Sequence, residues 1–365
     1  MHIGVPTEVK NNEYRVAITP AGAAELIEKG HHVVIQAGAG VASAFTDQDY
    51  AQAGAEIVDS AAKAWAAEMV LKVKEPVTEE YQYLREDLIL FTYLHLAAEP
   101  ELTAKLIESG TTAIAYETVQ LPNGTLPLLT PMSEVAGCLA TQVGATQLWR
   151  RNGGRGLLLG GIAGTPKGRF VVIGGGTAGE NAAKIALGMG ANVTILDISL
   201  QRLQQLESRF SGQVETIRSS PYAVAEAVAQ ADVVVGAALV PGAAAPKLVT
   251  NEMVRKMKPG SVLVDIAIDQ GGCFADSRPT THDDPTFKVH DSIFYCVANM
   301  PGSVPNTSTI ALTNATLPYA AALADKGVDV AFLEDPALAL GANVRDGKIV
   351  NPAVAEAYTA ATSGL

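Results

Sequence analysis

Residues 170–186 read FVVIGGGTAGENAAKIA, in which a β-branched run is followed by glycines and then by small, helix-compatible residues. Gly174, Gly176 and Gly179 have the spacing G-x-G-x-x-G between the predicted strand and the predicted helix. In this motif the first glycine allows a tight turn, the second lets the backbone approach a pyrophosphate, and the third lets the helix pack closely on the strand. The N–H groups at the start of the helix suit phosphates. The stretch therefore predicts the dinucleotide-binding half of a Rossmann fold.

An acidic residue follows the glycine motif at the end of the next predicted strand. The apolar run 191–196 leads into Asp197, which is 18 residues after Gly179 (197 − 179). An acidic side chain there can accept hydrogen bonds from the ribose hydroxyls and would repel a 2′-phosphate. We therefore expect NAD rather than NADP as the cofactor, although the positive charge of Arg202 leaves NADP as the alternative.

The rest of the chain has the pattern of an α/β protein. Short apolar runs alternate with longer helical patterns, which is typical of βαβ units and parallel sheets. One series precedes residue 130 and a second begins at Phe170, and a length of 365 residues favours two domains. A helix-compatible stretch, Thr307–Asp325, would return the chain to the first domain and make that domain discontinuous. The predicted strands are His2–Val5, His32–Gln36, Met69–Val73, Leu88–Thr92, Ala113–Tyr116, Phe170–Ile173, Asn192–Leu196, Val214–Ile217, Asp232–Gly236, Ser261–Asp265 and Ile293–Cys296.

A long helix is predicted between the two series. It would begin near Pro131, because Ser133 can cap the first N–H groups and Glu134 suits the positive end of the helix dipole. Helix-compatible residues continue to Arg150. Further helices or helical turns are predicted at Ala21–Lys29, Gln48–Ala53, Ala61–Trp65, Tyr81–Leu84 and Glu101–Glu108.

Composition and charge argue against several classes of protein. The formal net charge of −12 and the pI near 5.0 disfavour a nucleic-acid partner, whose binding needs clustered lysine and arginine. The 3 cysteines are widely spaced, so neither a disulfide framework nor a zinc site is expected. The N-terminus lacks the regions of a signal peptide, and the most apolar stretch, Gly156–Gly164, is too short to span a bilayer. We therefore expect a cytoplasmic protein with no metal, membrane or nucleic-acid partner.

The loops after the later strands are expected to face the same cofactor, because ligands bind beyond the carboxyl ends of parallel strands. The run DIAIDQGG at 265–272 places Asp269 beside glycines at such a strand end, where a catalytic carboxylate could meet the nicotinamide. Asp265, in the apolar part of the run, is expected to make structural hydrogen bonds instead. Other contacts expected from these loops are Ala238, Leu239, Ile266, Ala267, Ile268, Val297, Ala298, Asn299 and Met300.

Three strand ends in the first series carry basic or titratable side chains. Arg15 follows the first strand, Lys74 ends an apolar run, and His95 follows the run Leu88–Thr92. The arginine fork matches a carboxylate, and an imidazole suits proton transfer near neutral pH. Taken alone, Arg15 would more commonly form a surface ion pair, and His95 would more commonly be a satisfied core histidine.

Several segments, taken together, resemble a known family. They are GVPTEVKNNEYRVA at 4–17, LKVKEP at 71–76, FTYLHL at 91–96, TPMSEVAG at 130–137, VDIAIDQGGC at 264–273 and VANMP at 297–301, with the glycine motif. They extend over nearly the whole chain. The sequence thereby resembles the bacterial L-alanine dehydrogenases, which form one superfamily with the NAD-binding subunit of proton-translocating transhydrogenase.

The resemblance implies a cytoplasmic homohexamer that carries out the reversible, NAD-dependent oxidative deamination of L-alanine to pyruvate and ammonia. It implies that Arg15 and Lys74 hold the substrate and that His95 and Asp269 are the catalytic acid–base residues. It also implies two Rossmann-like doubly wound domains, with an NAD-binding domain at 130–305 inserted into a substrate domain at 1–129 and 306–365. The residues implied for NAD, besides the loop residues above, are Ser133, Gly174, Gly176, Thr177, Ala178, Gly179, Asp197, Arg202 and Ser219.

Other functions remain open at this point. A soluble transhydrogenase-type subunit would pass hydride to a second nucleotide-binding protein, and a sensor or scaffold would bind NAD without catalysis. The combination of Arg15, Lys74, His95 and Asp269 argues against both. A related opine- or lysine-forming dehydrogenase is the third alternative.

Overall fold

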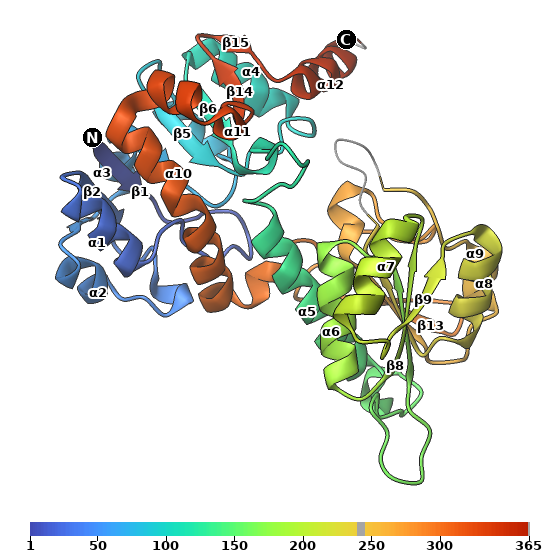
Figure 1. The fold of residues 1–365 in the computed structure, drawn as a ribbon. Helices are drawn as coiled ribbons and strands as arrows, with labels where there is room; N and C mark the ends of the chain where they lie inside the picture. Colours follow the sequence, from blue (N-terminus) through green and yellow to red (C-terminus); the bar gives the residue numbers. More distant parts are fainter. Residues whose placement is uncertain (239–244, 364–365) are drawn as a thin grey trace. The chain divides into compact units, whose positions relative to one another are not determined.

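The computed structural model describes residues 1–238 and 245–363 of the chain. The chain divides into two compact units. We call Met1–Met132 with Gly302–Leu365 the terminal unit, and Ser133–Pro301 the central unit. Each unit is a largely parallel sheet with helices packed on it (Figure 1). The expected α/β fold with two Rossmann-like doubly wound sheets is confirmed.

The sheet of the terminal unit has the strand order β15-β14-β6-β5-β4-β1-β2-β3. The pairs from β6 to β3 are parallel, whereas β14 is antiparallel to β6 and β15. The strands are β1 (His2–Val5), β2 (His32–Gln36), β3 (Glu56–Val58), β4 (Met69–Leu71), β5 (Ile89–Thr92), β6 (Thr112–Ala115), β14 (Ala342–Arg345) and β15 (Lys348–Ile349).

The helices of this unit begin at residues suited to helix starts. Thr19 caps α1 by accepting a hydrogen bond from the N–H of Gly22, and Pro20 costs little as the first helical residue because its missing N–H would have no partner there. The helices are α1 (Pro20–Glu28), α2 (Asp47–Gln52), α3 (Ala61–Trp65), α4 (Pro100–Ser109), α10 (Pro305–Glu334), α11 (Pro336–Ala339) and α12 (Pro352–Thr362), with 3₁₀ helices η1 (Val41–Ser43), η2 (Thr78–Tyr83) and η3 (Tyr116–Thr118).

The sheet of the central unit has the strand order β12-β13-β11-β10-β7-β8-β9, and only β12 pairs in the antiparallel sense among its described strands. The strands are β7 (Arg169–Ile173), β8 (Asn192–Asp197), β9 (Glu215–Arg218), β10 (Val233–Gly236), β11 (Val262–Asp265), β12 (Thr286–Val289) and β13 (Ser292–Tyr295). The helices are α5 (Thr130–Gln147), α6 (Thr177–Gly188), α7 (Leu200–Arg209), α8 (Pro221–Gln230) and α9 (Asn251–Arg255), with 3₁₀ helices η4 (Arg150–Asn152), η5 (Ile266–Gln270) and η6 (Met300–Ser303).

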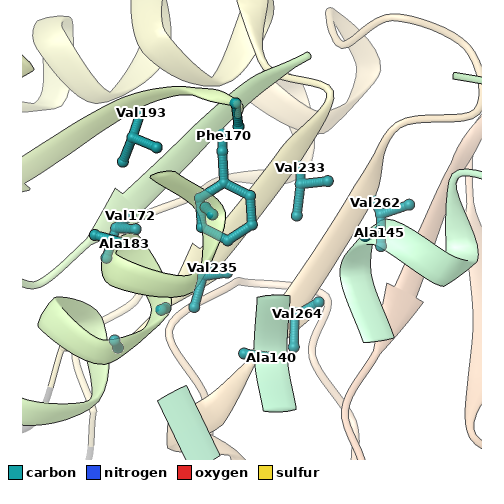
Figure 2. Close-up of a cluster of buried hydrophobic side chains, with 14 of the residues drawn as sticks. Ala140, Ala145, Phe170, Val172, Ala183, Val193, Val233, Val235, Val262 and Val264 are labelled. Carbon is teal, nitrogen blue, oxygen red and sulfur yellow. The ribbon is translucent and has the colours of Figure 1, made fainter. Parts of the chain in front are cut away.

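The hydrophobic core of the central unit fixes the register of its middle strands. Val172 of β7, Val235 of β10 and Val264 of β11 are neighbours across the sheet and are fully buried (Figure 2). They belong to one cluster with Ala140 of α5 and Ala183 of α6. Burying one such valine stabilises a fold by roughly 1.5–3 kcal/mol, and a slip by one residue would turn the whole set to the other face. The ends of these strands are therefore held in place.

The start of α5 differs from the sequence prediction. The helix begins at Thr130, so Ser133 lies inside it and does not cap it. The reason is local: the backbone N–H and the hydroxyl of Thr130 both donate to the carbonyl of Leu126, so the preceding turn leads straight into the helix. In the described parts of both units, every helix is too short or too polar to cross a membrane.

Candidate active site

Arg15, Lys74 and His95 all follow the carboxyl ends of neighbouring strands in the terminal unit. Arg15 is in the segment after β1, Lys74 follows β4 and His95 follows β5, and these strands are adjacent and parallel. Because the carboxyl ends of parallel strands lie at one edge, the segments that follow them start from the same edge. The fold thus gathers the three predicted substrate-side residues in one part of the terminal unit.

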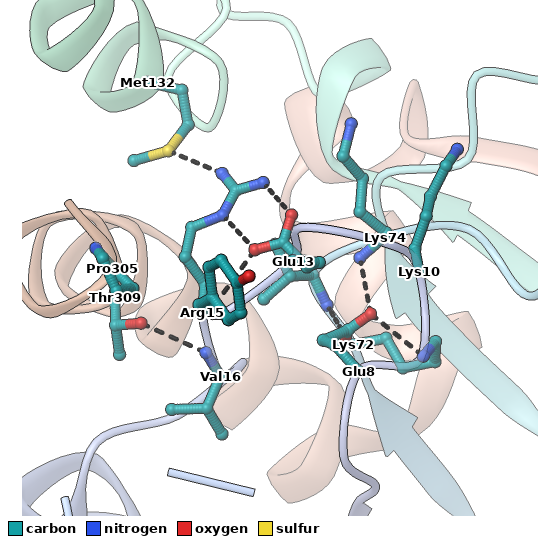
Figure 3. Close-up of polar contacts among 12 residues, drawn as sticks. Glu8, Lys10, Glu13, Arg15, Val16, Lys72, Lys74, Met132, Pro305 and Thr309 are labelled. Carbon is teal, nitrogen blue, oxygen red and sulfur yellow. Dashed lines mark hydrogen bonds and ion pairs between the residues drawn. The ribbon is translucent and has the colours of Figure 1, made fainter. Parts of the chain in front are cut away.

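The guanidinium of Arg15 is buried and held by a carboxylate. Its Nε donates to Oε1 of Glu13 at 2.7 Å, its Nη2 donates to Oε2 at 2.6 Å, and Nη1 lies 3.0 Å from the sulfur of Met132 (Figure 3). Burial works to lower the pKa of Arg15, but the pairing with Glu13 outweighs it and raises the pKa. Arg15 therefore stays cationic. The alternative of a surface ion pair is wrong, because only 3% of Arg15 is exposed.

The two lysines after β4 have different surroundings. The ammonium of Lys72 is fully buried between Glu8 and Glu80, with N–O distances of 3.1 and 3.0 Å. Lys74 is half-buried, and its side chain extends away from Glu8 (Figure 3). Glu8 also accepts hydrogen bonds from the backbone N–H groups of Val73 and Lys74, at 2.6 and 3.4 Å. Lys72 thus has a structural role, whereas part of the Lys74 side chain remains accessible.

His95 is exposed and is held by two carboxylates. Its Nδ1 lies 3.1 Å from Oε2 of Glu75, and its backbone N–H donates to Oε1 of Glu117 at 2.6 Å. The backbone of His95 has φ of +51°, a region that non-glycine residues seldom adopt. The side chain is 41% exposed, so the alternative of a core histidine is wrong.

The predicted cofactor residues of the central unit follow the carboxyl ends of its parallel strands. One of the predicted residues, Leu239, lies outside the described residues, and the others are placed as follows. The glycine motif follows β7, Asp197 ends β8, Ser219 follows β9, Ala238 follows β10, Ile266–Asp269 lie in η5 after β11, and Val297–Met300 follow β13. Strand order thus brings these residues to one edge of the sheet, although they are far apart in sequence.

The backbone of the glycine motif has no room for larger residues at two positions. Gly174 has φ of +101°, and a Cβ at Gly179 would lie 1.9 Å from the carbonyl oxygen of Gly174. At Gly176, by contrast, a Cβ would meet no described atom within 4 Å beyond its chain neighbours. Gly176 is the N-cap of α6 and provides no side-chain cap. The N–H groups of the first turn of α6 are thus left to bind an anion in an open space.

Asp197 and Arg202 are both tied to the glycine turn. Oδ2 of Asp197 accepts a hydrogen bond from the N–H of Gly175 at 2.7 Å. The Nε of Arg202 donates to the carbonyl of Gly175 at 2.6 Å, and its Nη2 pairs with Glu180. The positive charge of Arg202 is therefore already balanced by an acid.

Helix α5 packs tightly against the first turn of α6. A Cβ at Gly137 would lie 2.1 Å from the carbonyl oxygen of Ala178, and the hydroxyl of Thr141 donates to the carbonyl of Ala182 at 2.7 Å. Ser133 lies one turn before Gly137 on α5 and so shares its face. Ser133 is thereby directed toward the side of α5 that meets the start of α6.

Asp265 has the structural role expected of it. Its carboxylate accepts hydrogen bonds from the N–H groups of Ala267 and Cys273, at 3.2 and 2.8 Å, and from the hydroxyl of Ser277 at 2.5 Å. Burial raises the pKa of Asp265, although these bonds oppose the shift. Asp265 thereby holds both ends of the segment that carries Asp269, whose own side chain is exposed.

Sequence reasoning did not single out four acids that hold the substrate-side residues. They are Glu8, Glu13, Glu75 and Glu117. Glu13 lies two residues from its partner, and an acid so close to a buried arginine could have been noticed. Glu75 and Glu117 are 20 and 22 residues from His95, and no local pattern relates them.

Two family models cover most of the chain. The model described as "Alanine dehydrogenase/PNT, N-terminal domain" matches residues 4–136, and "Alanine dehydrogenase/PNT, C-terminal domain" matches residues 140–352. An alanine dehydrogenase of Mycolicibacterium smegmatis is 62% identical over 98% of this chain and 96% of its own. One of Staphylococcus epidermidis is 56% identical over 98% of this chain and 97% of its own.

Solved structures give the same picture. A structure of an L-alanine dehydrogenase superposes with a TM-score of 0.96 at 52% identity and covers 99% of both chains. A transhydrogenase from Sinorhizobium meliloti superposes with a TM-score of 0.83 at 27% identity, covering 97% of this chain and 100% of its own. With this similarity in sequence and in structure over nearly its full length, the chain belongs to the alanine dehydrogenase/PNT family.

Proposed function

We propose that this protein is an NAD-dependent alanine dehydrogenase. It converts L-alanine, NAD and water into pyruvate, ammonium, NADH and a proton, and the reaction is reversible. One observation carries the proposal: Arg15, Lys74 and His95 occur together in a chain that is 62% identical, over 98% of its length, to a protein named alanine dehydrogenase.

The central unit fits a dinucleotide cofactor. The open space at Gly176 and the uncapped first turn of α6 suit a pyrophosphate. Asp197 at the end of β8 suits the ribose hydroxyls and would repel a 2′-phosphate, while Arg202 is already paired with Glu180. These features support NAD over NADP.

The two parts of the chain would then have separate tasks. We assign substrate binding to residues 1–129 and 306–365 and NAD binding to residues 130–305. The proposed cofactor contacts are Ser133, Gly174, Gly176, Thr177, Ala178, Gly179, Asp197, Arg202, Ser219, Ala238, Leu239, Ile266, Ala267, Ile268, Asp269, Val297, Ala298, Asn299 and Met300.

The chain's own residues would prepare the substrate and move its protons. NAD, when bound, supplies the acceptor for the hydride that leaves the α-carbon of alanine. Arg15 and Lys74 fix the carboxylate and the carbonyl oxygen by charge, which lowers the entropic part of the barrier. His95 takes and returns protons of the amine and of the added water, and Asp269 orients that water and the ammonium group.

A homohexameric assembly in the cytoplasm completes the proposal and rests on the family resemblance alone. Light scattering of the purified protein at several concentrations tests the assembly. A mass equal to one chain at every concentration would reject it.

Following NADH absorbance tests the function in both directions. The protein should form NADH from NAD with L-alanine and consume NADH with pyruvate and ammonium. His95→Ala should lose turnover by about 10²–10⁴ while NADH binding, measured by fluorescence, stays near that of the unaltered protein. A protein that binds NADH but shows no change in absorbance in either direction would support the transhydrogenase-type or sensor alternatives instead.

A further inference from the structure

We propose that Glu75 is the positioning residue of His95: its carboxylate accepts the Nδ1–H of the imidazole and leaves Nε2 as the atom that exchanges protons with the substrate. The inference rests on the proposed function, because it concerns the acid–base group of that reaction. It adds a residue that neither the glycine motif nor the substrate-side residues contain.

The geometry joins the ends of two adjacent strands. Glu75 lies in the segment after β4 and His95 in the segment after β5, and Nδ1 of the ring lies 3.1 Å from Oε2 of the acid. The side chain of Glu75 is 5% exposed, whereas that of His95 is 41% exposed. One nitrogen of the ring therefore faces a buried acid, while the ring as a whole stays accessible to a ligand.

The charge of Glu75 decides which nitrogen carries the proton. Burial alone would raise the pKa of Glu75, but the hydrogen bond and charge of His95, the charge of Lys74 and the hydrogen bond from Lys10 outweigh it and lower the pKa to about 2. An ionised carboxylate can only accept hydrogen bonds. Nδ1 must then be a donor in the neutral ring as well as in the cationic ring, and the lone pair of the neutral ring lies on Nε2.

The other oxygen of Glu75 has a separate partner. Lys10, from the segment after β1, forms an ion pair with Oε1 of Glu75, while Oε2 faces His95. The carboxylate is thereby held between two strand ends. An acid fixed in this way cannot turn its plane freely, so it restrains the orientation of the imidazole as well as its tautomer.

The backbone of His95 is fixed independently of its ring. Glu117 accepts hydrogen bonds from the N–H groups of Leu94 and His95, and the His95 bond is 2.6 Å long. These bonds hold the left-handed conformation at His95, which has φ of +51°. The ring of Tyr93 is stacked near the imidazole, with 5.9 Å between the ring centroids and 27° between their planes. Backbone and ring are thus positioned by different acids.

Several charged or titratable groups surround His95 among the described residues of the terminal unit. They are Glu75 and Lys74 from the segment after β4, Lys10 from the segment after β1, Tyr93 beside the ring, and Glu117 from η3. Replacing Glu75 by glutamine removes the negative charge that lies closest to Nδ1 and keeps the size of the side chain. Proton loss from the imidazole should then occur at lower pH.

The test compares Glu75→Gln with Glu79→Gln in the full-length protein. Glu79 is an exposed acid of η2 and serves as the matched control. Glu75→Gln should lower kcat for alanine by about 10–100-fold, with the KM for NAD unchanged and the acidic limb of the kcat/KM–pH profile moved to lower pH. Glu79→Gln should match the unaltered protein in all three.

A second measurement does not depend on turnover. Diethylpyrocarbonate acylates the neutral imidazole, so the pH dependence of modification at the peptide containing His95, followed by mass spectrometry, reports where that ring loses its proton. The midpoint of this pH dependence should move to lower pH in Glu75→Gln. It should stay in place in Glu75→Asp, which keeps the negative charge on a shorter side chain. Glu75→Asp should also recover part of the lost kcat.

The outcomes separate this inference from the proposed function. If the unaltered protein does not turn over alanine, the proposed function fails. The pH midpoint of His95 modification still tests the pairing of Glu75 with His95 in that case. A Glu75→Gln protein with unchanged kcat and an unchanged midpoint overturns the inference. If Glu75→Gln does not fold, as judged by NADH binding and a cooperative unfolding transition, Glu75→Asp decides: a kcat equal to that of the unaltered protein overturns it.

Discussion

Oδ2 of Asp197 accepts a hydrogen bond from the backbone N–H of Gly175 at 2.7 Å, while its Oδ1 accepts one from the N–H of Ser199 at 2.8 Å. The acid that ends β8 is therefore attached to the glycine turn that follows β7. These two bonds fix the orientation of the carboxylate at the end of β8. Such preorganisation lowers the entropic cost of binding.

Replacing Asp197 by alanine should weaken the binding of NADH and reduce the preference for it over NADPH. The ribose would lose a hydrogen-bond acceptor, which costs about 1.5–3 kcal/mol for a charged partner, or roughly a tenfold change in Kd or more. Repulsion of a 2′-phosphate would also disappear. Fluorescence titration with both cofactors measures the two effects. Glu207→Ala, at an exposed position of α7, is the control, and unchanged Kd values in Asp197→Ala would contradict the assignment.

Replacing Gly179 by alanine should abolish tight NADH binding. The added Cβ would stand 1.9 Å from the carbonyl oxygen of Gly174, so α6 would have to move away from the glycine turn. Overpacking of this kind costs about 1–3 kcal/mol in stability. Gly188→Ala is a matched control, because it lies in the same helix and its Cβ would meet no described atom within 4 Å outside that helix.

The control variant should bind NADH normally and gain stability, since alanine is favoured over glycine in a helix by about 0.5–1 kcal/mol. Thermal unfolding and NADH titration distinguish the two variants. Equal behaviour of Gly179→Ala and Gly188→Ala would show that the close approach at Gly174 is not required.

Replacing Lys72 by methionine should destabilise the protein strongly. Lys72 pairs with both Glu8 and Glu80, and all three side chains are buried. Removing one member of a buried ion pair leaves an uncompensated charge and costs about 3–5 kcal/mol. Denaturant unfolding measures the loss, and Lys63→Met is the control because the Lys63–Asp59 pair is exposed and should contribute little to stability. A loss for Lys72→Met no larger than for Lys63→Met would contradict this account.

The contribution of Glu75 to stability should disappear in acid. Its pKa is about 2 in the folded protein against an ordinary value of 4.5, so the unfolded chain binds the proton more tightly. Its stabilising effect is therefore fully present above pH about 4.5 and is lost as the pH falls toward about 2. Urea unfolding of the unaltered protein and of Glu75→Gln should show a difference in free energy that shrinks over this range. A difference that grows on acidification would mean that the sign of the shift is wrong.

The sequence predicted the fold well where strands are apolar and parallel. β1 and β2 have the predicted bounds, and most other predicted strands differ by one or two residues. β3, β12, β14 and β15 were not predicted, because they are short strands of 2 to 4 residues that lie at or next to sheet edges. Ser133 was misjudged as a cap because the turn before Thr130 has no distinctive sequence pattern.

The candidate site was predictable in its residue types but not in its contacts. Strand-end positions indicated Arg15, Lys74 and His95, and only family resemblance gave them roles. The pairing of His95 with Glu75 depends on β4 and β5 being neighbours, which follows from the strand order of the whole sheet. A sequence pattern cannot show such a contact between two separate loops.

The transfer of deuterium from alanine labelled at its α-carbon tests the central claim most directly. The protein would be incubated with NAD and this alanine, and the reduced cofactor analysed by mass spectrometry. The account predicts NADH that carries one deuterium per pyruvate formed, because hydride leaves the α-carbon directly. NADH without deuterium, or no reduced cofactor at all, would contradict it.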